Sequence, residues 1–138
     1  MNVELYWQIH QLAFLLEKRA DEALKNQTNI GFAQYKVLEA VGRNMLAKQN
    51  LIAELLNQTE ASISRQVKIL EKKGLLTIGT VMNNRRAREL ALTEQGDEVL
   101  RHSEELLDMV QSQIFGVLHF EEQQAMQQLL ERMLQKSR

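Results

Sequence analysis

The sequence contains no cysteine and no proline, has six glycines among 138 residues, and is only 5% aromatic. Without cysteine the chain forms no disulfide, no thiolate metal site and no thiol redox switch. The lack of proline and the few aromatic residues favour a mostly helical protein over a sandwich of many short strands. No apolar run approaches the roughly 18 residues of a membrane span, and no signal-peptide pattern is present, so we expect a cytoplasmic protein without a membrane partner.

What the chain does contain fits one globular domain, with 44% hydrophobic and 25% charged residues over 1–138. Its charge is uneven: residues 1–59 are neutral (six basic, six acidic), residues 60–88 carry +5 (seven basic, two acidic), and residues 89–138 carry −6 (four basic, ten acidic). Such a basic stretch indicates a face for a polyanion, although charge runs also occur on ordinary solvated helix faces.

Helical periodicity dominates both ends of the chain. Over residues 3–24, Leu5, Ile9, Leu12 and Leu16 form one stripe, and further apolar residues lie beside it. Near the other end, a helix is predicted to follow Thr93 as its N-cap and to run through Ile114. A last helix is predicted from about Glu121 to Leu134.

Between these ends the pattern predicts three more helices. The stretch 26–31 has turn chemistry, and helices are predicted over 32–41 and 51–56. The third helix begins after Thr59, whose side chain can accept from the backbone N–H of Ala61 or Ser62, and ends at Gly74 in a left-handed conformation.

The third helix has two different faces. Ile63, Val67 and Leu70 fall on one side, which we expect to face the core. The opposite side is basic and small, and is formed by Ala61, Arg65, Lys68 and Lys72, flanked by Ser62 and Ser64.

A β-hairpin is predicted after Gly74. Residues 75–81 are apolar or β-branched, Asn83-Asn84 tolerate a turn, and residues 88–92 alternate like a returning strand. Three arginines, Arg85, Arg86 and Arg88, lie at or just past its tip.

Helix, turn, helix and basic hairpin in this order form a winged helix-turn-helix. In this architecture the second helix of the motif fits the major groove of DNA, and arginines of the wing can enter the minor groove. We therefore expect a mostly α protein with a small β-hairpin wing. Its winged helix-turn-helix lobe spans residues 32–96, between terminal helices at 1–25 and 97–138 that form a dimer.

These motifs resemble those of the MarR-type transcriptional regulators. The matching segments are Ile52–Leu56, Ala61–Arg65, Ile69–Leu75, Asn84–Ala87, Leu92-Thr93 and Gly96. The resemblance implies an obligate homodimer that binds a pseudo-palindromic operator in double-stranded DNA, usually as a repressor, and that a small aromatic or phenolic ligand often releases. It implies base and phosphate contacts for Ser62, Ser64 and Arg65, phosphate contacts for Lys68, and minor-groove insertion for Arg86.

Further residues join this candidate DNA-binding set by position. Glu60 begins the helix and can accept from a cytosine amino group. The complete set is Thr59, Glu60, Ala61, Ser62, Ser64, Arg65, Lys68, Lys72, Arg85, Arg86 and Arg88. Asn84 stands where the family usually has an aspartate at the wing.

The terminal helices have more apolar surface than a monomer of this size can bury, which predicts a two-fold dimer with recognition helices about one DNA turn apart. The candidate interface residues are Leu5, Ile9, Leu12, Val110, Ile114, Leu129, Leu130 and Met133. By the resemblance, an effector would bind between these helices and the DNA-binding lobe. The candidate lining residues, which are equally suited to a core, are Trp7, His10, Phe14, Phe32 and Tyr35.

Other functions have less support. His10, His102 and His119 are too scattered to predict a metal site, and no catalytic motif or phosphate-binding loop occurs, so we expect neither an enzyme nor a cofactor. A protein-interaction module, an antirepressor or adaptor whose basic face binds an acidic protein, is the alternative to a DNA-binding regulator.

Overall fold

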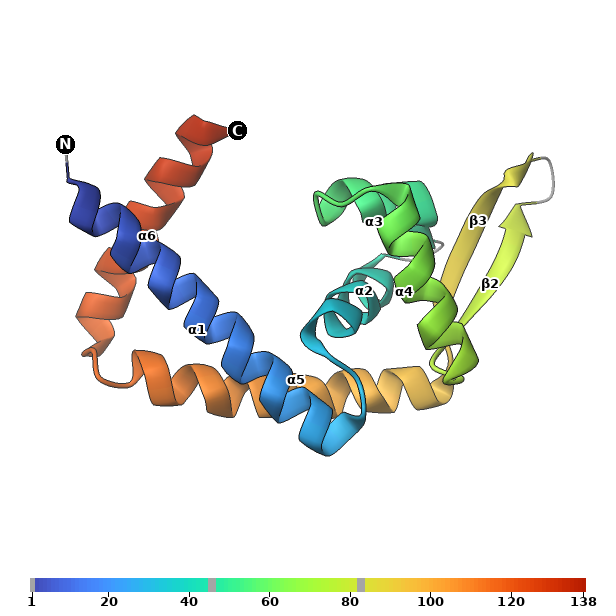
Figure 1. Ribbon diagram of the computed structural model, residues 1–138, viewed down its shortest axis with the longest axis horizontal. Helices are drawn as coiled ribbons and strands as arrows, with labels where there is room; N and C mark the ends of the chain where they lie inside the picture. The colour runs from blue at the N-terminus through green and yellow to red at the C-terminus, as the bar shows by residue number, and fades with distance from the viewer. Residues whose placement is uncertain (1, 45–46, 82–83) are drawn as a thin grey trace.

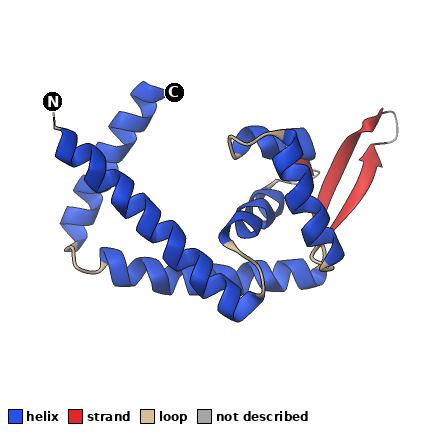
Figure 2. Ribbon diagram, in the orientation of Figure 1, coloured by secondary structure: helices blue, strands red, loops and turns tan. Residues whose placement is uncertain are grey.

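The computed structural model describes residues 2–44, 47–81 and 84–138, and their side chains except those of 80–88. The helices are α1 (Val3–Thr28), α2 (Phe32–Arg43), α3 (Gln49–Leu55), α4 (Glu60–Lys72), α5 (Glu94–Phe115) and α6 (Phe120–Ser137). The strands are β1 (Ala47–Lys48), β2 (Leu76–Val81) and β3 (Asn84–Leu92). Figure 2 shows the expected fold class, a mostly helical chain with one small sheet.

The chain is arranged as two ends joined by one long helix. Figure 1 shows α1 crossing α6 at one end, and α2, α3, α4 and the hairpin grouped at the other. The long helix α5 passes under both ends and packs along α1. Within the described ranges even the 26-residue α1 lacks an apolar window that could cross a bilayer.

The hydrophobic core lies within the winged-helix end. It is formed by the inner faces of α2, α3 and α4, by the sheet, and by the first turns of α5. Its fully buried large residues include Leu38, Ile52, Ile63, Val67, Leu70, Leu76 and Leu90. Because three of these residues lie on α4, burial of its inner face fixes which side of that helix is presented to solvent.

The predicted helix boundaries at α4 and α5 are confirmed by their caps. The Thr59 Oγ1 atom accepts from the Ser62 backbone N–H at 3.1 Å, and Gly74 takes the left-handed conformation with φ of 76°. The Thr93 Oγ1 atom accepts from the Gly96 backbone N–H at 2.9 Å.

Several helices extend beyond the predicted ranges, among them α1 and α3. Helix α1 continues to Thr28 instead of ending at Leu24, because the Thr28 hydroxyl donates to the Leu24 carbonyl at 2.6 Å and Asn29, with φ of 61°, supplies the left-handed cap. Helix α3 begins at Gln49, directly after β1, instead of at residue 51.

The sheet contains one strand that the sequence pattern does not reveal. Strand β1 pairs with β3, which lies between β1 and β2. Its two residues are too few to show the period of a strand. Strand β3 begins at Asn84 instead of residue 88, so the three wing arginines lie within it, whereas the predicted turn residue Asn83 lies outside the described residues.

Candidate nucleic-acid interface

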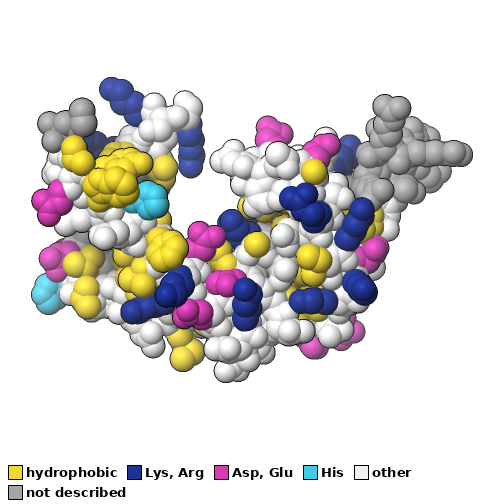
Figure 3. All heavy atoms as spheres, in the orientation of Figure 1, with side chains coloured by type: hydrophobic (Ala, Val, Ile, Leu, Met, Phe, Trp, Pro, Cys, Tyr) yellow, Lys and Arg dark blue, Asp and Glu magenta, His cyan; other side chains and the backbone are white. Residues whose placement is uncertain are grey.

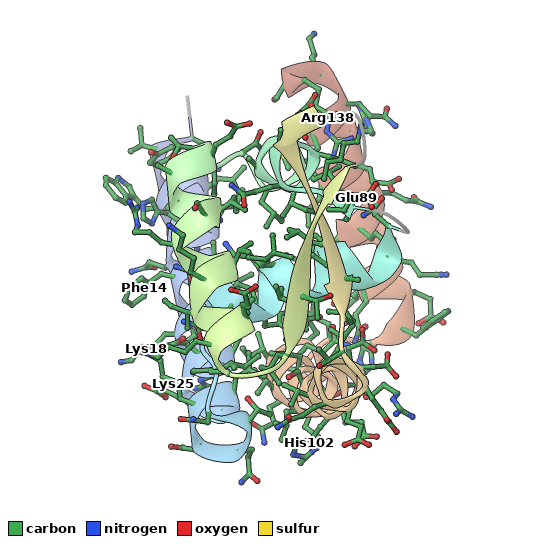
Figure 4. The ribbon with its side chains drawn as sticks, turned by 90° about the vertical axis from the view of Figure 1, so that its right-hand side faces the viewer. Phe14, Lys18, Lys25, Glu89, His102 and Arg138 are labelled. Atoms are coloured by element: carbon green, nitrogen blue, oxygen red, sulfur yellow. The ribbon has the colours of Figure 1, made fainter. Side chains whose placement is uncertain are left out.

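The outer face of α4 is a basic surface. Ala61, Arg65, Lys68 and Lys72 are exposed, while Ile63 and its neighbours on the inner face are buried. Figure 4 looks at this end of the molecule, with α4 in front and the hairpin beside it. The helix therefore presents a line of cations to solvent.

The first turn of α4 is held by polar side chains. The Ser62 hydroxyl donates to Gln58 Oε1 at 3.0 Å, and Thr59 caps the helix. Glu60 is exposed beside these residues, and Ser64 is half-buried. The turn thus presents hydroxyl groups and backbone N–H groups, which suit contacts with phosphate or base edges.

The cations of the α4 face are not neutralised within the described side chains. The ion pairs found there join Lys25 to Asp21, Arg43 to Glu39 and Arg101 to Asp97, and a His–carboxylate contact joins His102 to Glu105. None of these contacts involves α4. Arg65, Lys68 and Lys72 therefore keep their charge available to a polyanion.

Lys73, one residue past α4, has a different position that the sequence did not reveal. Its Nζ atom donates to the Asn29 carbonyl at 2.6 Å. This bond ties the end of α4 to the turn between α1 and α2, so Lys73 positions the helix instead of extending its basic face.

The wing lies next to this face. Figure 1 shows the β2–β3 hairpin projecting beside α4. Arg85, Arg86 and Arg88 belong to β3, but their side chains lie outside the described residues. The backbone therefore brings the wing arginines to the same end of the molecule as α4.

The candidate dimer residues gather mainly where α1 crosses α6. Leu5, Ile9, Leu129, Leu130 and Met133 line one groove of about 810 Å³ between these helices. Leu129 keeps 53% of its surface exposed, and none of the described residues of α6 is buried.

The other candidate dimer residues lie elsewhere. Leu12 and Ile114 are half-buried, and Val110 lines a separate cavity between α1, α2 and α5. The structure therefore brings five of the eight residues together in the α1–α6 groove, and distributes the remaining three along the helices that lead to it.

The candidate ligand residues separate into two groups. Phe32 and Tyr35 line the cavity between α1, α2 and α5, which measures about 540 Å³. Trp7 and Phe14 are 56% and 65% exposed, and His10 is exposed beside Trp7, with ring centroids 5.8 Å apart. Figure 4 shows Phe14 projecting outward from α1. These three residues lie outside that cavity.

The remaining wall of the cavity comes mainly from α1 and α5, and sequence reasoning did not identify it. Its residues are Ala13, Leu16, Glu17, Ala20, Glu104, Leu107, Asp108, Val110, Gln111 and Phe115. Glu104 and Asp108 occur among many other acidic residues of the 89–138 stretch, so only the packing of α5 against α1 distinguishes them.

The histidines lie apart. His102 is 3.9 Å from Glu105 on α5, and His119 is the residue before α6. In the described part of the chain, no group of three or more His, Asp or Glu side chains is placed to hold a metal ion.

Comparison with known proteins gives both a curated relative and structural neighbours, while no protein-family model matches the chain. The transcriptional regulator HosA of Escherichia coli is 26% identical over 91% of this chain and 93% of its own length. The MepR–DNA complex of S. aureus superimposes with a TM-score of 0.85 at 22% identity, covering 95% of this chain and 96% of that one. A MarR variant from E. coli complexed with operator DNA gives a TM-score of 0.86 at 20% identity, covering 96% and 94%. The winged helix-turn-helix fold predicted from the sequence is therefore confirmed.

Proposed function

We propose that this chain, which has the fold of the MarR-type transcriptional regulators, is a dimeric, sequence-specific DNA-binding regulator. In this proposal it acts as a repressor of transcription that a small aromatic or phenolic ligand releases. Its candidate partner is a pseudo-palindromic operator, with one half-site for each subunit.

The observation that carries the proposal is the α4 face. An α-helix fits the major groove of B-DNA, and exposed arginine and lysine side chains can reach bases and phosphates from it. Arg65, Lys68 and Lys72 form such a row, with the half-buried Ser64 beside Arg65 on α4. The solved relatives with the same fold include two in complex with DNA.

Dimer formation is supported by the α1–α6 end. The groove there is lined by apolar residues such as Leu5, Leu129 and Met133, and these side chains are 46–53% exposed. Exposed apolar patches of this kind mark interaction surfaces, and a two-fold axis through this end would give two α4 helices for two half-sites.

Release by a ligand is supported by the location of the second cavity. It is bounded by α1 and α5, which reach the proposed dimer end, and by Phe32 and Tyr35 of α2, which belongs to the winged-helix end. A ligand there could change the spacing of the two α4 helices if it binds one arrangement more tightly than the other.

The test is binding to duplex DNA from the region flanking the chain's own gene, measured by fluorescence anisotropy at two salt concentrations. We expect steep loss of affinity with salt and weaker binding to a scrambled duplex. Arg65→Ala should cost about 1–3 kcal/mol on the operator and reduce its preference over the scrambled duplex. Lys68→Ala should weaken both duplexes alike.

The matched control is Lys18→Ala, which removes an exposed cation from α1 (Figure 4) and should leave both affinities unchanged. Absence of binding to any duplex at low salt would refute the proposal and favour the protein-interaction module. Equal effects of Lys18→Ala and Lys68→Ala would refute the assignment of the α4 face.

A further inference from the structure

The cavity between α1, α2 and α5 has the size of a site for a small organic molecule. Its volume of about 540 Å³ lies within the range of ordinary ligand sites. Leu16, Leu107 and Val110 supply apolar wall from the two long helices. A flat hydrophobic group can therefore contact apolar side chains there.

Two aromatic side chains of α2 form another part of the wall. The rings of Phe32 and Tyr35 are stacked, with centroids 5.9 Å apart and planes inclined by 23°. The Lys36 ammonium lies 5.3 Å from the Phe32 centroid, within the range of a cation–π contact. The wall thus offers aromatic rings, one of which already holds the Lys36 ammonium over its face.

The charged lining residues are all acidic. Glu17 of α1 and Glu104 and Asp108 of α5 lie on the cavity wall, and none of its described lining residues is Lys, Arg or His. These three carboxylates are absent from the ion pairs of the described side chains. Figure 3 shows acidic side chains where the surface is hollowed between the two ends of the molecule, with a few Lys and Arg side chains near them.

Nearby negative charges also act on the phenol of Tyr35. Its pKa is raised by burial and by the negative charges of Glu39 and Glu104, so the phenol stays neutral. An anion in the cavity would meet the same repulsion from Glu104, whereas a cation would be attracted.

We infer that this cavity binds an organic cation in which a flat aromatic group carries the positive charge. The cavity and its aromatic wall provide the site, and the carboxylates determine the sign of the ligand's charge. Among the aromatic and phenolic ligands of the proposed function, these carboxylates favour an aromatic cation over a phenolic anion. The inference rests on the proposed function only in treating the bound molecule as the effector that releases DNA.

Three probes of similar shape test the inference by isothermal titration calorimetry with the full chain: N-methylquinolinium as the cation, 2-methylnaphthalene as the neutral molecule and 2-naphthoate as the anion. We expect the cation to bind at least about tenfold more tightly than the anion, because three carboxylates act on it. Equal or tighter binding of 2-naphthoate, or no binding of any probe, would overturn the inference.

Variants then test which carboxylates act. The double variant Glu104→Gln with Asp108→Asn should weaken the binding of N-methylquinolinium by about tenfold, which is about threefold for each partly exposed charge. The binding of 2-methylnaphthalene should stay unchanged. Glu98→Gln removes an exposed carboxylate from the same helix outside the cavity and should leave cation binding unchanged. Unchanged cation binding in the double variant would refute the role of these carboxylates.

The same probes separate this inference from the proposed function. If the chain binds no duplex DNA but binds the cation in calorimetry, the proposed function fails and the cavity assignment stands. If the chain binds its operator but prefers the anion, the cavity assignment fails and the DNA-binding function stands.

Discussion

Thr93 connects the end of α4 to the start of α5, and its hydroxyl makes two hydrogen bonds that a single substitution removes. The Oγ1 atom accepts from the Gly96 backbone N–H at 2.9 Å and donates to the Gly74 carbonyl at 2.7 Å. The Thr93 backbone N–H also donates to the Leu75 carbonyl at 3.1 Å, and a side-chain change leaves that bond in place.

We expect Thr93→Ala to lower the free energy of unfolding by about 2 kcal/mol. Loss of an N-cap hydroxyl costs about 1 kcal/mol. Loss of the second hydrogen bond, to the Gly74 carbonyl, contributes about another 1 kcal/mol. Thr93→Ser keeps both bonds and should stay within about 0.5 kcal/mol of the parent chain.

Urea unfolding followed by circular dichroism measures both variants at one fixed protein concentration, since dimer formation would make stability depend on concentration. If Thr93→Ala costs less than about 0.5 kcal/mol, or if Thr93→Ser costs as much as Thr93→Ala, the hydroxyl does not make the connection that the structure describes.

Two further predictions concern close backbone contacts. At Gly96 an added methyl group would collide with the Leu75 backbone carbonyl, so Gly96→Ala should lower the free energy of unfolding in urea by about 1–3 kcal/mol. The control Gly79→Ala, whose nearest contact is at 4.0 Å, should lower it much less. Equal losses for the two variants would contradict the steric account. The Asp21 carboxylate accepts from the Phe32 backbone N–H, which lowers the pKa of Asp21 in the folded protein. The resulting stabilisation is present above the pKa of the unfolded chain, about 4, and is lost as pH falls through the lower pKa of the folded protein. Urea unfolding at several pH values should therefore show an Asp21→Asn variant less stable than the parent at pH 7 and equal to it in strong acid, and a difference that persists in acid would refute the role of the charge.

Local chemistry is what made the winged-helix end predictable. A cap hydroxyl at Thr59 and a left-handed glycine at Gly74 act within one turn of the chain, so sequence spacing alone locates them. The inner and outer faces of α4 follow equally from its 3.6-residue period. The extension of α1 to Thr28 was not predictable, because turn-like residues can also continue a helix when a threonine hydroxyl bonds back to the preceding turn.

The cavity shows where sequence reasoning fails. Phe32 and Tyr35 lie close together on α2, so their neighbourhood was foreseeable from helical spacing. Trp7 and Phe14 are aromatic like Phe32 and Tyr35, but they lie on the solvent-exposed side of α1. Their exposure depends on which side of α1 packs against α5, and the wide apolar surface of α1 allows more than one choice.

Helix α5 relates the acidic cavity to the basic face. Its N-terminus is fixed beneath the end of α4 by Thr93, and further along the same helix Glu104 and Asp108 line the cavity. The basic outer face of α4 and the acidic residues Glu104 and Asp108 therefore have separate places in the fold, one at the surface proposed for DNA and one beside the ligand cavity. A cation is attracted to the cavity and repelled from the α4 face, so it can bind without competing directly with DNA. Any effect it has on DNA must then pass through the packing of α5 against α1 and α2, which makes the position of α5 the quantity that a ligand has to change.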